Sequence, residues 1–156
     1  MASIINVDQI AEATSGNGVQ IPGHVIQVVQ GTSTTYTTLG TNNTYTDSGL
    51  TAAITPKFAS SKVLILHNAP IVYQYTEDMI MRVLRGSTNV YQLNFYAGND
   101  ANYHAMGGAF QFLDSPSTTS AITYKTQIYK NRGSFLYSYN NEVTSTSTLT
   151  LMEIAQ

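Results

Sequence analysis

The three histidines are the side chains best suited to bind a metal ion or to transfer protons near neutral pH, and they lie far apart in the sequence. None of His24, His67 and His104 has a second histidine at the spacing of metal ligands. The closest carboxylate pair, Glu77 and Asp78, is adjacent in sequence, and neighbouring residues of a strand point to opposite faces. We therefore expect hydrogen-bonded or solvated histidines, a solvated loop tip at the carboxylate pair, and no metal ion or other cofactor.

The sequence also lacks the motifs of nucleophilic and phosphate chemistry. Cysteine is absent, which excludes a disulfide framework, a thiolate zinc site and a cysteine nucleophile. No G-x-S-x-G elbow, P-loop or G-x-G-x-x-G fingerprint occurs. The 7 basic residues are scattered singly and the formal net charge is -2, so nothing marks a surface for nucleic acid. We predict that the protein is not an enzyme and has no nucleic-acid partner.

Tyrosine is the most informative residue type in this sequence. There are 11 tyrosines and no tryptophan, and several tyrosines lie at the ends of predicted strands beside asparagine or histidine. Tyrosine with Asn, Ser and Gly in loops is typical of adaptable binding surfaces, because the ring supplies contact area and the hydroxyl a polar group. The alternative is that most of these rings are ordinary strand residues or pack between subunits. The candidate residues for ligand or receptor binding are Tyr73, Tyr75, Tyr96, Asn102, Tyr103, His104, Tyr139, Asn140 and Asn141.

The elements that would position these loops are strands. Charged residues make up only 10% of the chain, and Thr and Tyr, which suit a pleated surface, supply much of its polarity. From residue 24 onward, short β-rich runs are separated by Gly, Asn, Ser and Pro turns. In Ile122–Lys130 the apolar residues fall on one face, and Lys125, Gln127 and Tyr129 on the other. The pattern predicts an all-β protein, a jelly-roll β-sandwich of eight or nine strands.

Several strands carry apolar residues on both faces. Lys62–Val72 is the most apolar run and is expected to be buried on both sides, with Pro70 marking a bend, a bulge or an edge position. Val90–Tyr91, Phe95–Tyr96 and Leu149–Ile154 are further examples. A two-layer sandwich needs one apolar face per sheet, so a second apolar face suggests burial between subunits. We therefore predict a homo-oligomer.

Residues 1–23 differ from the rest of the chain, because their apolar residues are sparse and a turn cluster occupies residues 15–18. The segment lacks the basic and apolar regions of a signal peptide, and no apolar run in the chain approaches the roughly 20 residues that span a bilayer. We predict an N-terminal attachment and trimerisation segment at 1–23, a jelly-roll knob domain at 24–156, and no membrane insertion. The candidate anchors for virion attachment are Ile4, Val7, Ile10, Val19 and Ile21.

The order of short motifs along the chain resembles a family of phage and prophage virion proteins. The motifs are Gly49-Leu50, Ile54-Thr55-Pro56, Ser61–Leu64, Arg85–Thr88, Phe112–Pro116, Thr118–Ser120, Tyr124-Lys125 and Ser147–Ile154, and the upstream stretch Thr14–Gln30 is similar to a segment of proteins from cyanophages and other marine phages. The resemblance covers nearly the whole chain. It implies a jelly-roll knob, often at the C-terminal end of tail-fibre polypeptides and trimeric in the manner of tumour-necrosis-factor-like heads, without catalytic residues. Fibre proteins normally carry a long shaft before the knob, whereas about 23 residues precede it here, which favours a short fibre, a fibre tip or a protein that sits on the capsid.

Three functions remain open on these grounds. The first is a homotrimeric short tail fibre or fibre tip that recognises a glycan or protein of the host surface. The second is a capsid decoration or cement protein that stabilises the phage head. A free carbohydrate-binding module is the third, against which the absence of a secretion signal and of tryptophan counts. We expect a virion protein, made in the host cytoplasm and released by lysis. Its partners would be other copies of itself, a tail, fibre-base or major capsid protein, and a host-surface glycan.

Overall fold

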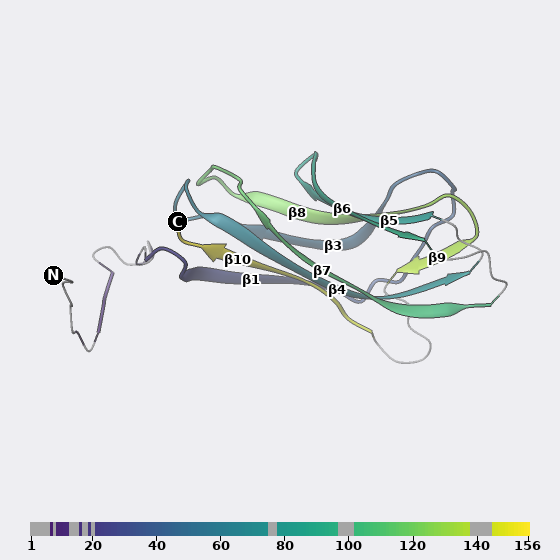
Figure 1. Ribbon diagram of the computed structural model, residues 1–156, viewed down its shortest axis with the longest axis horizontal. Helices are drawn as coiled ribbons and strands as arrows, with labels where there is room; N and C mark the ends of the chain where they lie inside the picture. Colours follow the sequence, from purple (N-terminus) through teal and green to yellow (C-terminus); the bar gives the residue numbers. More distant parts are fainter. Residues whose placement is uncertain are drawn as a thin grey trace.

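The computed structural model of the chain describes residues 7, 9–12, 16, 19, 21–74, 78–96, 102–137 and 145–156. This part of the chain contains ten strands and no helix, hence no helix long enough to cross a membrane. The strands are β1 (Val25–Ser33), β2 (Thr37–Thr38), β3 (Thr46–Ile54), β4 (Lys62–Gln74), β5 (Asp78–Arg85), β6 (Thr88–Tyr96), β7 (His104–Asp114), β8 (Ile122–Lys130), β9 (Ser134–Tyr137) and β10 (Ser147–Ile154). Figure 1 shows them as two layers, so the all-β prediction is confirmed, and the short strands β2 and β9 account for the excess over eight or nine.

The two antiparallel sheets have the topology of a jelly roll. One sheet has the order β3-β8-β5-β6, and we call it the second sheet. In the other, the first sheet, β4 pairs with β7 along one side and with β10 and then β9 along the other. β1 pairs with β10, and β2 with β9, so the first sheet is four strands wide in the order β1-β10-β4-β7. These two strand orders give the double-sheet sandwich that a jelly roll requires.

Pro70 lies inside a central strand, and the predicted bend, bulge or edge position is wrong as stated. β4 continues through Pro70, which pairs with Gly107 of β7. On the opposite side of β4, however, β10 pairs only as far as Asn68 and β9 begins only at Ile71. Pro70 therefore occupies the gap between two partner strands, where the N–H that proline lacks is not needed by the sheet.

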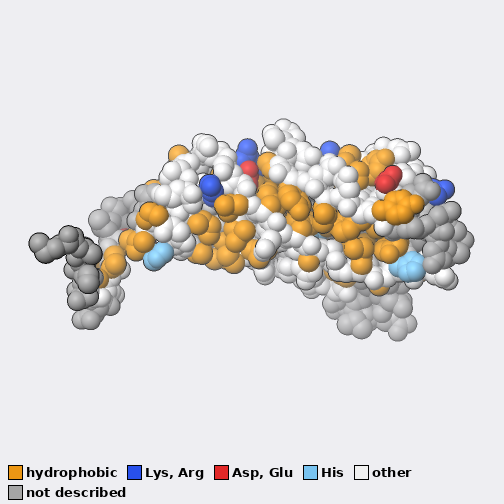
Figure 2. Space-filling model, in the orientation of Figure 1, with side chains coloured by type: hydrophobic (Ala, Val, Ile, Leu, Met, Phe, Trp, Pro, Cys, Tyr) orange, Lys and Arg blue, Asp and Glu red, His pale blue; other side chains and the backbone are white. Residues whose placement is uncertain are grey.

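The two sheets approach most closely where β1 meets β3. A Cβ atom on Gly31 would lie 1.9 Å from the carbonyl oxygen of Thr51, so only glycine fits between these backbones. On the opposite side of the sandwich, β6 and β7 are the free edges of their sheets, and aromatic side chains fill the space between them. Tyr91 of β6 stacks on Phe112 of β7 at 4.5 Å between ring centroids and on Phe110 at 5.0 Å. We call this the open side, and Figure 2 shows hydrophobic side chains gathered along it.

A fully buried carboxylate holds the loop between β3 and β4. Glu153 of β10 has no exposed surface. Its Oε1 accepts hydrogen bonds from the backbone N–H groups of Lys57 and Phe58 at 2.8 and 3.2 Å, and its Oε2 accepts one from Gln27 Nε2 at 2.6 Å. The same Gln27 amide also donates to the carbonyl of Thr55 at 2.7 Å. Burying a charge is tolerated only when such donors surround it, so Glu153 fixes the loop and the edge strand β1 together.

The buried histidine of β4 makes the stability depend on pH. His67 is 3% exposed, stacks on Phe110 at 4.4 Å, and has its Nδ1 2.8 Å from the carbonyl oxygen of Gly108. Burial lowers the pKa of His67 from 6.5 to about 4, although the contact with Gly108 works in the opposite direction. The folded state therefore keeps the ring neutral while the unfolded chain takes up a proton below pH 6.5. The contribution of His67 to stability is complete above pH 6.5 and is lost as the pH falls toward 4.

We expect the His67→Phe variant to lose this part of the pH dependence. The wild-type protein should lose about 3 kcal/mol of unfolding free energy through His67 between pH 7 and pH 4, beyond what its carboxylates contribute. The Phe ring preserves the stack on Phe110, so the variant isolates the titration from the packing. The measurement is denaturant unfolding of both proteins across this pH range at one protein concentration. Parallel stability curves for the two proteins would contradict the assignment.

The connections between strands divide between two ends of the sandwich. The register places residues 34–45, 102–103, 131–133 and 145–146 and the ends of β4 and β6 at one end, which we call the distal end. The loop between β3 and β4, the β5–β6 turn, residues 115–121 and the C-terminal residues lie at the other, proximal end. Gly23 donates to the carbonyl of Ala155, and Ala155 donates to the carbonyl of His24, both at 2.9 Å. The chain therefore enters the sandwich at the proximal end, opposite the distal connections (Figure 1).

Candidate functional site

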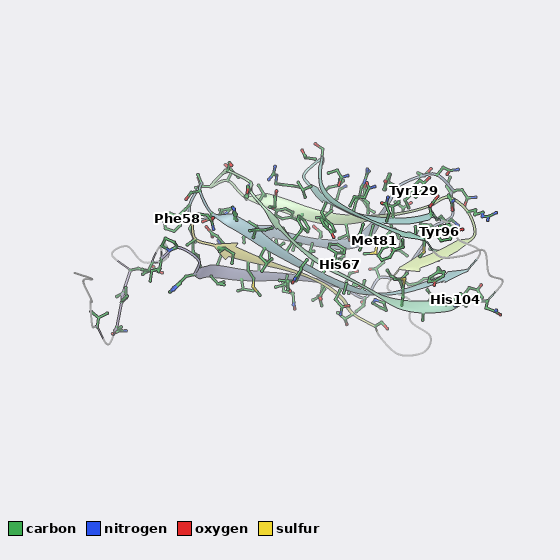
Figure 3. All side chains as sticks on the ribbon, viewed as in Figure 1. Phe58, His67, Met81, Tyr96, His104 and Tyr129 are labelled. Carbon is green, nitrogen blue, oxygen red and sulfur yellow. The ribbon has the colours of Figure 1, made fainter. Side chains whose placement is uncertain are left out.

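The distal end brings together part of the predicted receptor-binding set. Tyr73 at the end of β4 stacks on His104 at the start of β7, with ring centroids 5.3 Å apart and planes at 23°. Tyr103 is 64% exposed and Asn102 is exposed beside it. Tyr96, 76% exposed, ends β6 in the second sheet and lies at the same end of the molecule (Figure 3). The remaining candidates, Tyr75, Tyr139, Asn140 and Asn141, lie outside the described residues.

Of the predicted carboxylate pair, the structure describes Asp78 only. Asp78 begins β5, and three hydrogen bonds of 3.0 to 3.1 Å join it to Asn131 in the β8–β9 turn. The Asp78 backbone N–H donates to the Asn131 side-chain oxygen, and the Asn131 backbone N–H donates to the Asp78 carbonyl. The Asn131 side-chain amide donates to the Asp78 carboxylate. Glu77 lies outside the described residues. Within the parts of the chain that the structure describes, no three His, Cys, Asp or Glu side chains come together as a metal site would require. The distal end thus presents aromatic and amide groups beside His104 and Asp78.

Asp114 has a role that its sequence context does not indicate. Its Oδ2 accepts hydrogen bonds from Arg85 Nη1 at 2.8 Å and from the Tyr124 hydroxyl at 2.6 Å. Burial and the neighbouring carboxylate raise the pKa of Tyr124 far above its ordinary value, so the phenol remains a donor. Because Asp114 ends β7 of the first sheet while its partners belong to β5 and β8, the cluster ties the two sheets together at the proximal end.

The outer faces of the two sheets differ in chemistry. The outer face of the first sheet carries one charge, Lys62, at its edge; its apolar members are Val28, Leu64, Leu66, Leu113, Met152 and Ile154, and Val28 and Leu113 are about half exposed. A hollow of about 440 Å³ lies in this face, lined by Leu66, Ala109 and the polar side chains of Asn68, Gln111, Thr148 and Thr150, among others. A partly apolar face with a single charge at its edge is typical of a surface that another protein covers.

The outer face of the second sheet carries a continuous polar row instead. Asp47, Gln127, Arg82 and Gln92 are cross-strand neighbours on β3, β8, β5 and β6. Gln127 donates to Asp47 and accepts two hydrogen bonds from the Arg82 guanidinium at 2.9 and 2.6 Å. Lys125 pairs with Asp47 at 3.0 Å. These partners lower the pKa of Asp47 despite an opposing effect of burial. The alternation of Lys125, Gln127 and Tyr129 in the sequence predicted this polar face, but not the row across four strands.

Comparisons with known proteins find a structural similarity but no match in sequence. No family model matches the chain, and a search of curated proteins finds no match. Among solved structures, the chain is similar to PRD1 vertex protein P5, with 10% sequence identity and a TM-score of 0.38. The similarity covers 86% of this chain and 100% of that chain.

Proposed function

We propose that this chain is a structural protein of a bacteriophage particle, a homotrimeric short tail fibre or fibre tip that contacts the host surface. The observation that carries the proposal is the polarity of the sandwich. At the proximal end the chain presents apolar residues with nothing covering them, since Val7 and Ile10 are 56% and 59% exposed. At the distal end it presents tyrosine, asparagine and histidine. One end suits attachment to a particle, and the other suits recognition.

The proximal residues fit the predicted attachment segment in part. Val19 and Ile21 are half-buried, in contrast to Val7 and Ile10, while Ile4 lies outside the described residues. Ile21 accepts a backbone hydrogen bond from His24, which starts the turn into β1. The anchors closest to the sandwich are thus partly covered, and the more exposed anchors further upstream are available to a partner on the particle.

The partly apolar outer face of the first sheet supports the homotrimer. Four strands of eight to eleven paired residues cover roughly 600 Å² at a strand spacing of about 4.8 Å and a rise of about 3.3 Å, near the roughly 800 Å² per partner of a standard interface. A closed ring of three copies needs two unlike surfaces that fit each other. The outer face of the first sheet and the aromatic open side are two such surfaces, and they share strand β7. We therefore place the contact between copies there.

The position of the protein on the particle is tested by imaging. An antibody raised against the recombinant protein, applied to intact virions and viewed by electron microscopy, should label the tail or its fibres. Label spread over the whole head would instead identify a capsid decoration protein, which the same exposed proximal residues would also suit. Absence of label on particles, with the protein verified in the lysate, would exclude a virion role.

Removing residues 1–23 should separate attachment from folding. The strands begin at Val25, and among the described residues the deletion gives up two backbone hydrogen bonds, the one from Gly23 to Ala155 and the one from His24 to Ile21. We expect the shortened chain to remain folded, as judged by circular dichroism and thermal melting, but to be absent from purified particles. Ile10→Asp should reduce incorporation in the same direction, whereas Gln9→Asp, an equal charge on the neighbouring exposed residue, should not. Normal incorporation of the shortened chain would refute an attachment role.

A further inference from the structure

An aromatic cluster lies over the polar row on the outer face of the second sheet. The ring of Tyr45, which directly precedes β3, lies 3.4 Å from the guanidinium carbon of Arg82. The ring of Tyr129 from β8 lies next to the Tyr45 ring, with the two ring centroids 5.1 Å apart and the ring planes at 39°. The Tyr45 hydroxyl reaches Gln92 of β6 at 3.4 Å, so this side chain extends across the sheet. We call Tyr45, Arg82, Gln92, Gln127 and Tyr129 the Tyr45 platform.

The segment that carries Tyr45 is held in place from two sides. Asn43 adopts a left-handed conformation with φ of 57°, and its backbone N–H donates to the carbonyl of Lys130 at 2.8 Å. The Asn43 side-chain oxygen accepts a hydrogen bond from the Tyr129 hydroxyl at 2.9 Å. Below the ring, Arg82 is fixed by its two hydrogen bonds to Gln127. A half-buried aromatic cluster with its neighbours fixed loses little conformational entropy when a ligand binds.

Polar groups on β6 extend the platform in both directions. Asn89, Gln92 and Asn94 are all exposed and are joined by side-chain hydrogen bonds of 3.4 and 2.9 Å. Gln92, Asn94 and Tyr96 follow each other on one face of the strand, at a spacing of about 6.6 Å for every second residue. An amide both donates and accepts hydrogen bonds, as does a hydroxyl group. The row thus matches a ligand that presents several hydroxyl groups along its length.

The charges at the platform leave one net positive charge, because Arg82 and Lys125 lie beside the single carboxylate of Asp47. Asp47 is paired with Lys125 and bonded to Gln127, and the Arg82 guanidinium is engaged by Gln127 and the Tyr45 ring. A second, smaller hollow of about 200 Å³ adjoins the row, lined by Asp47, Lys125 and Thr51 among others. The single excess positive charge is on the Arg82 guanidinium, which Gln127 and the Tyr45 ring already engage, whereas a neutral polar ligand finds stacking area and hydrogen-bonding groups.

We propose that the Tyr45 platform binds a hydroxyl-rich saccharide of the host surface, with the sugar rings stacked on Tyr45 and Tyr129 and their hydroxyls bonded to the amides of β6. This inference rests on the proposed host-recognition function and moves its site from the distal loops to the side of the sandwich. Tyr96, the last residue of the β6 row, is the point at which the platform meets the distal end.

The test uses the full-length protein on an array of immobilised oligosaccharides built from glucose, galactose, mannose and N-acetylhexosamines, followed by titration of the best-bound oligosaccharide. We expect Tyr45→Ala and Tyr129→Ala each to weaken binding at least tenfold, and Tyr45→Phe, which keeps the ring, to stay within threefold of wild type. Gln92→Ala, an exposed position that the fold does not need, should also weaken binding. The matched control is Tyr36→Ala, which removes an exposed ring that belongs neither to the platform nor to the predicted receptor-binding set and should leave affinity unchanged. Thermal melting verifies that each variant is folded.

Adsorption of particles carrying each variant separates this inference from the function on which it rests. Loss of both saccharide binding and adsorption in the platform variants supports both. If Tyr103→Ala or Tyr96→Ala abolishes adsorption while Tyr45→Ala and Gln92→Ala do not, the platform is not the site, although host recognition stands. If the wild-type protein binds no saccharide of the array but still mediates adsorption, the ligand class is wrong. If particles without the protein adsorb normally, the host-recognition function itself falls.

Discussion

The variant Leu66→Arg is expected to convert the proposed trimer into single chains. Leu66 lies on the outer face of the first sheet and lines its central hollow. It is half-buried in the isolated chain, so an arginine there can extend into water and the fold should tolerate it. In the assembled trimer the same arginine would be buried without a partner, at a cost of several kcal/mol in each of the three contacts. Size-exclusion chromatography with light scattering should therefore report the mass of one 17.0 kDa chain at micromolar concentration.

Thr123→Arg is the matched control for this experiment. Thr123 is exposed on β8, on the outer face of the second sheet, where the platform requires access to solvent. The same substitution there should leave the mass at three chains. A wild-type protein that elutes as a single chain would refute the homotrimer, and a Leu66→Arg protein that remains trimeric would place the interface elsewhere.

The second large effect is expected from Glu153→Ala, which should lower the free energy of unfolding by about 3 kcal/mol, because removing one partner leaves several buried groups unpaired. The substitution deprives the backbone N–H groups of Lys57 and Phe58 of their acceptor and leaves Gln27 with only the carbonyl of Thr55. It also opens a cavity in a position with no exposed surface. Denaturant unfolding at fixed protein concentration measures the loss, since assembly would otherwise change the apparent stability.

Glu153→Gln distinguishes the hydrogen bonds from the cavity. The amide fills the same volume and keeps one oxygen for the loop N–H groups, but it turns an N–H₂ group toward the Gln27 amide, which is itself a donor here. We expect a loss between those of wild type and the alanine variant. Equal losses for both variants would mean that the charge alone matters. No loss for either would show that the loop between β3 and β4 does not depend on this carboxylate.

Most of the fold could be predicted because strand signals are local. The alternation in Ile122–Lys130 reappears in the structure, with Tyr124 and Ile128 in the core and Gln127 outside. The interpretation of Pro70 was wrong because the break lies in the partner strands, between β10 and β9, and a sequence pattern carries no information about where a partner ends. Part of the second apolar face, at Tyr91, proved to be packing across the open side within one chain.

The candidate sites were less predictable, because they are made by side chains distant in sequence. Tyr73 and His104 were predicted separately, and only the pairing of β4 with β7 stacks them. Tyr45 was missed because its neighbours suggest an ordinary turn, while its contacts with Arg82 and Gln92 lie 37 and 47 residues further along. The contacts of Asp114 could not be predicted for the same reason, because its partners belong to the opposite sheet.

The pairing of β1 with β10 has a consequence for how the protein is made. Val25 lies opposite Ile154, so the first sheet closes only after nearly the whole chain has left the ribosome. Until β10 has been made, β1 and β4 lack the partner strand that pairs with both of them. Pairing of distant segments is slow and leaves intermediates prone to aggregation. We therefore expect a chain truncated before residue 147 to be insoluble rather than to form a shortened sandwich.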